Sequence, residues 1–158
     1  MRVNIREIVL TAAVVLWPIA AIGQESIAIK SFTVFMGQCR LQIIVGFFPC
    51  DGRVIYTELK NGRSMVTFTK ANAMFTVSGG TDRQPDLEDY YVGIDTIRLH
   101  QENGEEAEDH GMGGECHFRM NESASKFFDI KCNVYNRAKG SYYSFFLEKI
   151  TKFNRKVF

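Results

Sequence analysis

Four cysteines constrain the fold of this 158-residue chain more than any other feature. Cys116 and Cys132 lie symmetrically about the turn-like segment Asn121–Ser125. If the flanking segments 114–120 and 127–135 form an antiparallel hairpin, the two cysteines face each other about 4.5 Å apart at Cα, within disulfide reach. The spacing therefore predicts a Cys116–Cys132 disulfide inside a β-hairpin.

Cys39 and Cys50 form the second predicted disulfide, by elimination. In one straight strand their Cα atoms would be about 35 Å apart, and no bond could form. The chain must therefore reverse direction near residues 44–46, where Gly46 is the only good turn residue.

Most of the chain after residue 26 reads as short strands separated by turn signals. Asp51-Gly52 and Asn61-Gly62 are strong hairpin dipeptides, because their residues tolerate the positive φ of a type I′ turn. A loop is expected over Gln101–Gly113. The apolar residues of the tail Leu147–Phe158 have helical spacing, and the alternative is that this tail is the frayed end of the last strand. The expected strands are 27–35, 54–59, 63–69, 73–78, 90–99, 114–120, 127–135 and 142–150.

This pattern predicts an all-β fold, an antiparallel meander of eight or nine strands that forms a β-sandwich or a small barrel stapled by two disulfides. Thirteen phenylalanines and six tyrosines supply bulky core residues. Two interiors are compatible with the pattern: a core filled by side chains, or a barrel with room for a small apolar ligand.

The first 23 residues have the three parts of a secretory signal peptide. Arg2 and Arg6 supply a basic start, an apolar run follows, and small residues precede an expected cleavage after Gly23. A retained membrane anchor is the alternative, but the run is shorter than the roughly 20 residues that span a bilayer and Pro18 interrupts it. We therefore expect a signal peptide at 1–23 and a single secreted β-domain at 24–158, in the periplasm or secreted, with no transmembrane segment after cleavage.

Charge is balanced overall but uneven along the chain. The 19 Lys and Arg residues nearly match the 18 Asp and Glu residues, which argues against a nucleic-acid partner bound through phosphates. The segment 81–115 is strongly acidic, and the C-terminal segment 116–158 is basic. The acidic segment could pair with the basic one, and the basic tail is a candidate for weak contact with a membrane surface.

All three histidines, His100, His110 and His117, lie within residues 100–117, at the end of this acidic segment and just beyond it. Imidazole and carboxylate groups are metal ligands, so a divalent metal is a candidate cofactor here. No standard ligand spacing is present, and a flexible acidic loop is the alternative.

Candidate residues for binding a ligand or partner also lie between 81 and 115. Arg83 is one of two basic residues in this stretch and follows two glycines that permit unusual backbone angles. The structural alternative is a turn in which Arg83 pairs with a carboxylate of the same chain. The candidates are Arg83, Asp82, Glu105, Glu106 and Asp109.

No catalytic residue is assigned from the sequence. The serines do not lie in a Gly-x-Ser-x-Gly motif, and both cysteine pairs are expected to be oxidised. Closely spaced carboxylates such as Asp86 and Glu88 are typical of solvated loops.

Five segments carry a resemblance to known sequences: Cys50–Tyr56, Asn61–Arg63, Ser78–Pro85, Ile94–Leu99 and Gly114–Cys116. Together they resemble an uncharacterised group of small periplasmic proteins of alphaproteobacteria, over most of the chain after residue 23. The resemblance implies the bacterial periplasm as the destination and carries no activity with it.

These observations predict a non-enzymatic binding or interaction protein of the cell envelope, with an unknown envelope protein or a small ligand as its partner. Two alternatives remain open. One is a carrier of a small apolar ligand inside the barrel, and the other is a metal-dependent activity at the three histidines.

Overall fold

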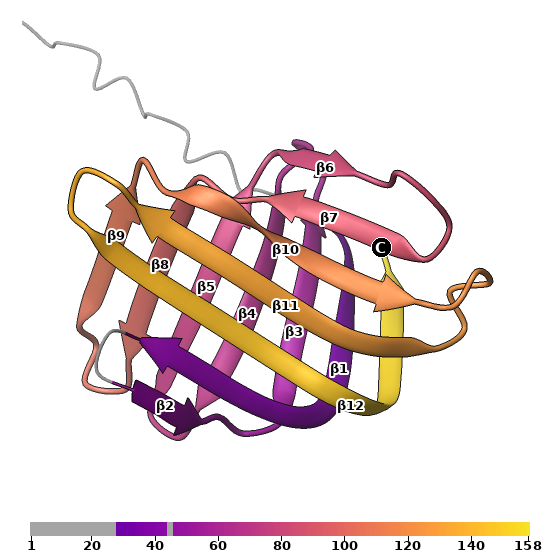
Figure 1. Ribbon diagram of the computed structural model, residues 1–158, viewed down its shortest axis with the longest axis horizontal. Coiled ribbons are helices and arrows are strands. Elements are labelled where there is room, and N and C mark those ends of the chain that lie inside the picture. Colours follow the sequence, from indigo (N-terminus) through magenta and orange to yellow (C-terminus); the bar gives the residue numbers. More distant parts are fainter. Residues whose placement is uncertain (1–27, 44–45) are drawn as a thin grey trace, which may run out of the picture.

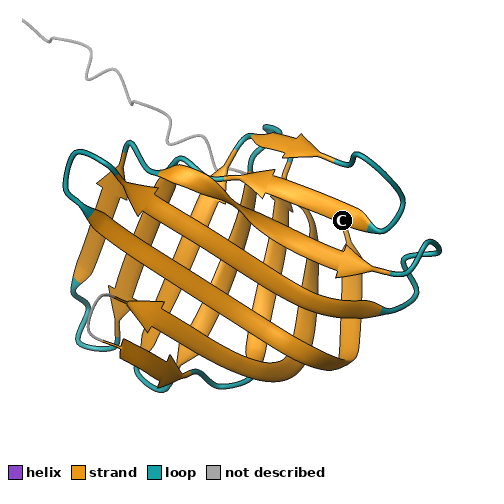
Figure 2. Ribbon diagram, in the orientation of Figure 1, coloured by secondary structure: helices purple, strands orange, loops and turns teal. Residues whose placement is uncertain are grey.

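The computed structural model describes residues 28–43 and 46–158, and this part of the chain contains strands and no helix (Figure 2). Alternating apolar residues and frequent turn dipeptides account for this content, because each strand can bury one face and then reverse. The strands are β1 (Ile29–Ile43), β2 (Gly46–Pro49), β3 (Arg53–Leu59), β4 (Ser64–Lys70), β5 (Ala73–Gly79), β6 (Thr81–Arg83), β7 (Asp89–Gly93), β8 (Thr96–Gln101), β9 (Glu106–His110), β10 (Gly113–Met120), β11 (Phe127–Asn136) and β12 (Ser141–Val157).

The strands form one antiparallel sheet that curls over on itself as a half-barrel (Figure 1). The strand order is β6-β7-β10-β11-β12-β1-β3-β4-β5-β8-β9, and β2 pairs with β1. In Figure 1 a front half, which contains β7, β10, β11 and the beginning of β12, crosses over a rear half of β3, β4, β5, β8 and β9. The inner faces of the two halves enclose the core.

β1 and β12 belong to both halves because each of them bends. β1 pairs with β3 up to Met36 and with β2 from Arg40 onward. The register between β1 and β12 shifts at this bend, where Gly37 lies. A Cβ atom on Gly37 would lie 2.6 Å from the carbonyl oxygen of Glu148, so the bend requires a residue without a side chain.

On the opposite side of the sheet the chain crosses between the halves at three adjacent corners. These corners connect β5 to β6, β7 to β8, and β9 to β10. Backbone hydrogen bonds join them: Asp95 N donates to Ser78 O at 3.0 Å, and Met112 N donates to Asp95 O at 3.0 Å. Strands that switch sheets at such corners are typical of sandwiches whose halves cross obliquely.

The core between the halves is filled with large side chains. Phe68 of β4 stacks on Phe145 of β12 with ring centroids 4.9 Å apart, and Tyr56 of β3 meets Phe118 of β10 edge-on at 5.2 Å. Contacts of this kind across the halves bury aromatic surface, which is the main favourable contribution to folding. The fully buried large side chains are Phe35, Phe68, Phe118, Phe145, Leu41, Ile130, Leu147, Val54, Val66, Val77, Val92 and Val134.

The all-β class and both disulfides are confirmed. Cys116 of β10 lies opposite Cys132 of β11 in the register, and the two residues are bonded with their Cα atoms 3.9 Å apart. Cys39 and Cys50 are bonded across the β1–β2 pair, with Cα atoms 5.1 Å apart. The sheet has more strands than the eight or nine expected, because β2, β6 and β9 are additional and one expected strand is divided in two.

The expected strand over residues 90–99 is two strands, β7 and β8. They are separated by Ile94-Asp95, where the chain passes from the front half to the rear half. Up to the corner alternate residues are buried, Val92 and Ile94, whereas after it two consecutive residues are buried, Thr96 and Ile97. The change of phase at the corner explains why alternation along this segment is imperfect.

The expected loop over Gln101–Gly113 was wrong at residues 106–110 and at its two ends, which belong to β8 and β10. Residues 106–110 form β9, which pairs with β8 around a four-residue turn. The tail is also a strand and not a helix, since β12 continues to Val157 and pairs with β1 over residues 144–148 and 152–157. In both cases pairing with a neighbouring strand overrides local composition.

Asp51-Gly52 does not close a hairpin between its two flanking strands. It connects β2 to β3, and each of these strands pairs with a different part of β1. Asn61-Gly62 does close the predicted β3–β4 hairpin, in which Leu59 N donates to Arg63 O at 2.9 Å.

The predicted signal peptide and its cleavage site lie outside the described residues. None of the described residues forms a helix long and apolar enough to cross a membrane. The two disulfides indicate an oxidising environment, outside the cytoplasm or secreted.

Candidate functional site

A pocket of about 280 Å³ opens at one end of the curled sheet, between β1, β3 and β12 of the rear half and β10 and β11 of the front half. The bends in β1 and β12 create this opening, because the end of β12 follows the rear half while β11 stays in the front half. Gln84 and Ala124 line the pocket at its mouth. The volume lies near the lower end of the range for ligand pockets, about 300 to 1,000 Å³.

Four phenylalanines from four different strands form the apolar wall of the pocket. Phe35 of β1 meets Phe127 of β11 edge-on, with centroids 4.8 Å apart, and Phe127 meets Phe153 of β12 in the same way at 4.9 Å. Phe118 of β10 completes the wall, 6.1 Å from Phe35. Such a wall favours apolar and aromatic groups, and ring faces also attract cations.

Tyrosine and carboxylate groups form the polar end of the pocket. Tyr90 Oη and Ser64 Oγ both donate to Asp82 Oδ2, at 2.5 and 2.6 Å. Tyr56 Oη lies 2.8 Å from Tyr90 Oη and 3.2 Å from Ser64 Oγ. Since the latter two hydroxyls give their protons to Asp82, the single proton of Tyr56 can go to only one acceptor at a time: Tyr90 Oη, Ser64 Oγ or Glu58 Oε1 at 3.4 Å. The lone pairs of Tyr56 and the second oxygen of Asp82 are left as acceptors.

Glu58 is a second carboxylate at this end of the pocket. Ser31 Oγ donates to Glu58 Oε2 at 2.5 Å, and Arg155 lies 3.3 Å from the same oxygen. Lys30 approaches this oxygen at 3.8 Å. Only a fifth of the Glu58 side chain is exposed, so the carboxylate is held in place by neighbours from β1 and β12.

Burial raises the pKa of both tyrosines in this cluster. The pKa of Tyr56 rises to about 12, mainly because burial disfavours the phenolate, and nearby Asp82 and Glu58 add to the effect. The pKa of Tyr90 is raised as well, by burial and by its hydrogen bond to Asp82. Both phenols therefore stay protonated throughout the neutral range and act as hydrogen-bonding groups.

We expect this cluster to make the protein less stable as the pH rises from about 10 to about 12. Tyrosines of the unfolded chain lose their protons near pH 10, whereas folded Tyr56 keeps its proton until about pH 12. The free energy of unfolding should then fall by up to about 1.4 kcal/mol per pH unit for this group. Urea unfolding of the wild type and of Tyr56→Phe at several pH values measures the difference. An unchanged slope in Tyr56→Phe would contradict the raised pKa of Tyr56.

Of the five predicted ligand-binding or partner-binding residues, Asp82 belongs to the pocket cluster. Arg83, its neighbour on β6, faces away from Asp82 and pairs with Glu115 at 2.8 Å. Its guanidinium also lies over the ring of Tyr91, 3.8 Å from the centroid, and Tyr91 stacks on His117. The structure thus shows the internal Arg83–carboxylate pair that the sequence left as an alternative.

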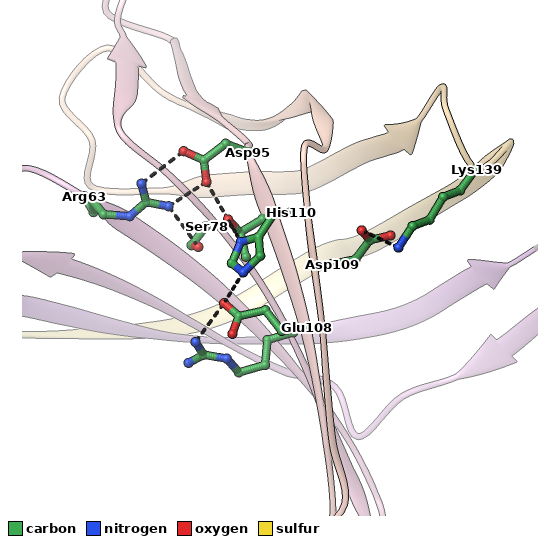
Figure 3. Close-up of polar contacts among 9 residues, drawn as sticks. Arg63, Ser78, Asp95, Glu108, Asp109, His110 and Lys139 are labelled. Carbon is green, nitrogen blue, oxygen red and sulfur yellow. Dashed lines mark hydrogen bonds and ion pairs between the residues drawn. The ribbon is translucent and has the colours of Figure 1, made fainter.

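The other three predicted residues lie on the β8–β9 hairpin, away from the pocket. Glu106 contacts His100 at 2.8 Å, and Asp109 is paired with Lys139 at 2.9 Å. Figure 3 shows Asp109 directed toward Lys139 and away from its neighbours Glu108 and His110. Glu105 is exposed in the turn between the strands. These carboxylates do not converge on one site.

The three histidines are also separated. His100 and His110 lie at opposite ends of the β8–β9 hairpin, and His117 lies on β10, where it contacts Asp89. Within residues 28–43 and 46–158, no group of three or more His, Cys, Asp and Glu side chains is placed to hold a metal ion. Metal binding at these histidines stays a prediction of the sequence.

A second polar cluster lies on the outer face of the rear half (Figure 3). Arg63 forms two hydrogen bonds to Asp95, at 2.6 and 3.0 Å, and this pairing lowers the pKa of Asp95. Thr96 lies 3.4 Å from His110, and His110 lies 3.8 Å from Glu108. The Thr96 hydroxyl donates to Asp95 at 2.8 Å, so its proton is not directed at His110 and the group is not arranged as a nucleophile with its base.

Sequence reasoning missed the pocket residues Tyr56, Glu58 and Tyr90. One signal was available, because Glu58 follows Val54 and Tyr56 at alternate positions of a strand, on the face that Val54 marks as buried. An inward-facing carboxylate in such a strand indicates a special environment. The contact of Tyr56 with Tyr90 had no local signal, since the two residues are 34 positions apart.

The resemblance to small periplasmic proteins stays a prediction. No protein-family model matches the chain, and no curated protein matches it.

Proposed function

We propose that this protein is a non-enzymatic binding protein of the bacterial periplasm, and that it holds a small amphipathic molecule in the pocket at the open end of its sheet. The observation that carries the proposal is the pairing of an aromatic wall with a polar end rich in hydrogen-bond acceptors. The disulfides and the signal-peptide pattern of the first 23 residues support the periplasm as its location.

The ligand that fits has an apolar or aromatic body and a polar end that donates hydrogen bonds, such as a protonated amine. The phenylalanine rings would hold the body. The polar end would meet the carboxylate of Glu58 and the lone pairs of Tyr56, which line the pocket, and would lie near Asp82, which is hydrogen-bonded to the lining residue Tyr90. The ligand is small, because the interior beyond the pocket is filled by side chains.

Blocking the mouth tests the proposal. Gln84 lines the mouth and is exposed, so Gln84→Trp should fold normally and close the pocket. Native mass spectrometry of protein taken from the periplasm should show a bound small molecule in the wild type and its loss in the variant. Leu87→Trp is the control, since Leu87 lies in the same loop, is exposed and does not line the pocket. A wild-type mass that is always free of ligand would count against the proposal.

The ligand class can be tested with two probes that share one ring. Benzylamine should raise the melting temperature of the wild type by more than benzoate does at the same concentration, because a bound carboxylate would face Glu58 and lie near Asp82, with Arg155 the one cationic group among the described residues that line the pocket. The shift should disappear in Gln84→Trp and remain in Leu87→Trp. Equal shifts of the melting temperature with both probes would contradict the proposed preference of the pocket for a protonated amine.

Binding of an envelope protein through the acidic β8–β9 hairpin stays a prediction of the sequence.

A further inference from the structure

The outer face of the sheet near the C-terminus combines apolar and basic side chains. The register places Phe32, Val34 and Met36 of β1 on the side opposite the core residue Phe35. Solvent-facing positions of an antiparallel sheet are ordinarily polar. Here a groove of about 540 Å³ follows β1 and β12, and its walls are largely apolar side chains of β1 and the stems of lysines.

Basic residues surround these apolar positions. Lys152 lies opposite Met36 in the register and Lys156 lies opposite Phe32, both on β12. Arg53 of β3 lies on the other side of Met36. Among the described residues, neither lysine forms an ion pair with a carboxylate within 4.0 Å, so their charges are available to a partner.

The terminal residue of the chain is held on this face. Phe158 N donates to Lys30 O at 3.0 Å, and the Phe158 ring lies 5.8 Å from the ring of Phe32. Lys156 Nζ lies 4.9 Å from the centroid of the Phe158 ring. More than half of Phe158 is exposed, so the face presents an aromatic ring beside an ammonium group.

We propose that this face, defined by Phe32, Val34, Met36, Lys152, Lys156 and Phe158, rests on the surface of an anionic phospholipid bilayer. Basic groups next to aromatic and aliphatic groups match a membrane interface, where lysines meet anionic headgroups and apolar side chains enter the boundary below them. The charge of the face favours this occupant over a neutral apolar partner. The inference does not depend on the pocket, which lies on the opposite side of β12.

Co-sedimentation with vesicles tests the proposal. The purified protein should bind vesicles that contain phosphatidylglycerol and should not bind vesicles of phosphatidylcholine alone, and binding should weaken with added salt. Lys152→Gln/Lys156→Gln should weaken binding about thirtyfold. Lys126→Gln/Lys139→Gln removes the same charge from exposed lysines in two turns elsewhere and should leave binding unchanged.

Phe158→Ser separates this model from attraction by net charge alone. The exposed terminal ring should contribute to partitioning, so its loss should weaken binding severalfold without changing the charge. Equal loss of binding in the two double-lysine variants would overturn the proposal. So would a wild-type dimer in light scattering that Lys152→Gln/Lys156→Gln converts to monomer without any binding to vesicles, because the face would then serve a second copy.

Discussion

Replacing both Cys116 and Cys132 with alanine is expected to lower the free energy of unfolding by about 4 to 5 kcal/mol. Closing a loop of about 15 residues restricts the unfolded chain by about 3 kcal/mol. Both cysteines are also fully buried in the core between the two halves, and the loss of their sulfur atoms leaves a cavity. Urea unfolding of the variant and the wild type measures the difference.

Cys39→Ala/Cys50→Ala is the matched control for this prediction. Its loop is of similar length, with a sequence separation of 11 against 16, so the effect on the unfolded chain is nearly the same. Both residues are only half-buried and lie at the β1–β2 pair, so little cavity forms. We expect a loss of about 3 kcal/mol. A loss equal to that of the Cys116–Cys132 variant would mean that burial of the disulfide in the core contributes nothing.

Gly79→Ala is expected to destabilise the protein by about 3 kcal/mol or more. Gly79 lies at the corner where the chain passes from β5 to β6, and an added Cβ would overlap the carbonyl oxygen of Gly93 on β7. Neither group can move alone, because backbone hydrogen bonds join the adjacent corners, such as Asp95 N to Ser78 O. Overpacking against fixed backbone therefore shifts the whole corner.

The neighbouring glycine provides the control for Gly79→Ala. An added Cβ on Gly80 would have no neighbour closer than 3.9 Å, on the flexible side chain of Arg63. Gly80→Ala should therefore change the free energy of unfolding by less than about 0.5 kcal/mol. Thermal or urea unfolding of both variants checks the pair, and similar stabilities would contradict the packing at this corner.

The corner at Gly79 also connects stability to the candidate site. β6 begins two residues after Gly79 and carries Asp82, which accepts hydrogen bonds from Ser64 and Tyr90. A displaced corner would move Asp82 away from the two hydroxyls.

Local signals were sufficient for the hairpin of β10 and β11 and its disulfide. The turn at Asn121–Ser125 and the alternation on both sides of it fix the register, and the register fixes which residues are opposite one another. Asn61-Gly62 was sufficient for the β3–β4 hairpin for the same reason. Asp51-Gly52 carried an equally strong signal but connects strands that do not pair with each other, because β1 is long enough to pair with both.

The sequence alone determined the all-β class, the two disulfides and the segments that carry the charge, because these depend on residue type and on spacing along a single strand or hairpin. The tertiary structure decided where the sheet bends, that residues 106–110 pair as a strand, and which polar groups meet at the pocket. Tyr56 meets Tyr90, and Glu58 meets Arg155 across 97 positions. Alternation places a side chain on the inner or outer face of its own strand. Its neighbour from a distant strand is set only when the corners, the bends and the packed core fix the two halves against each other.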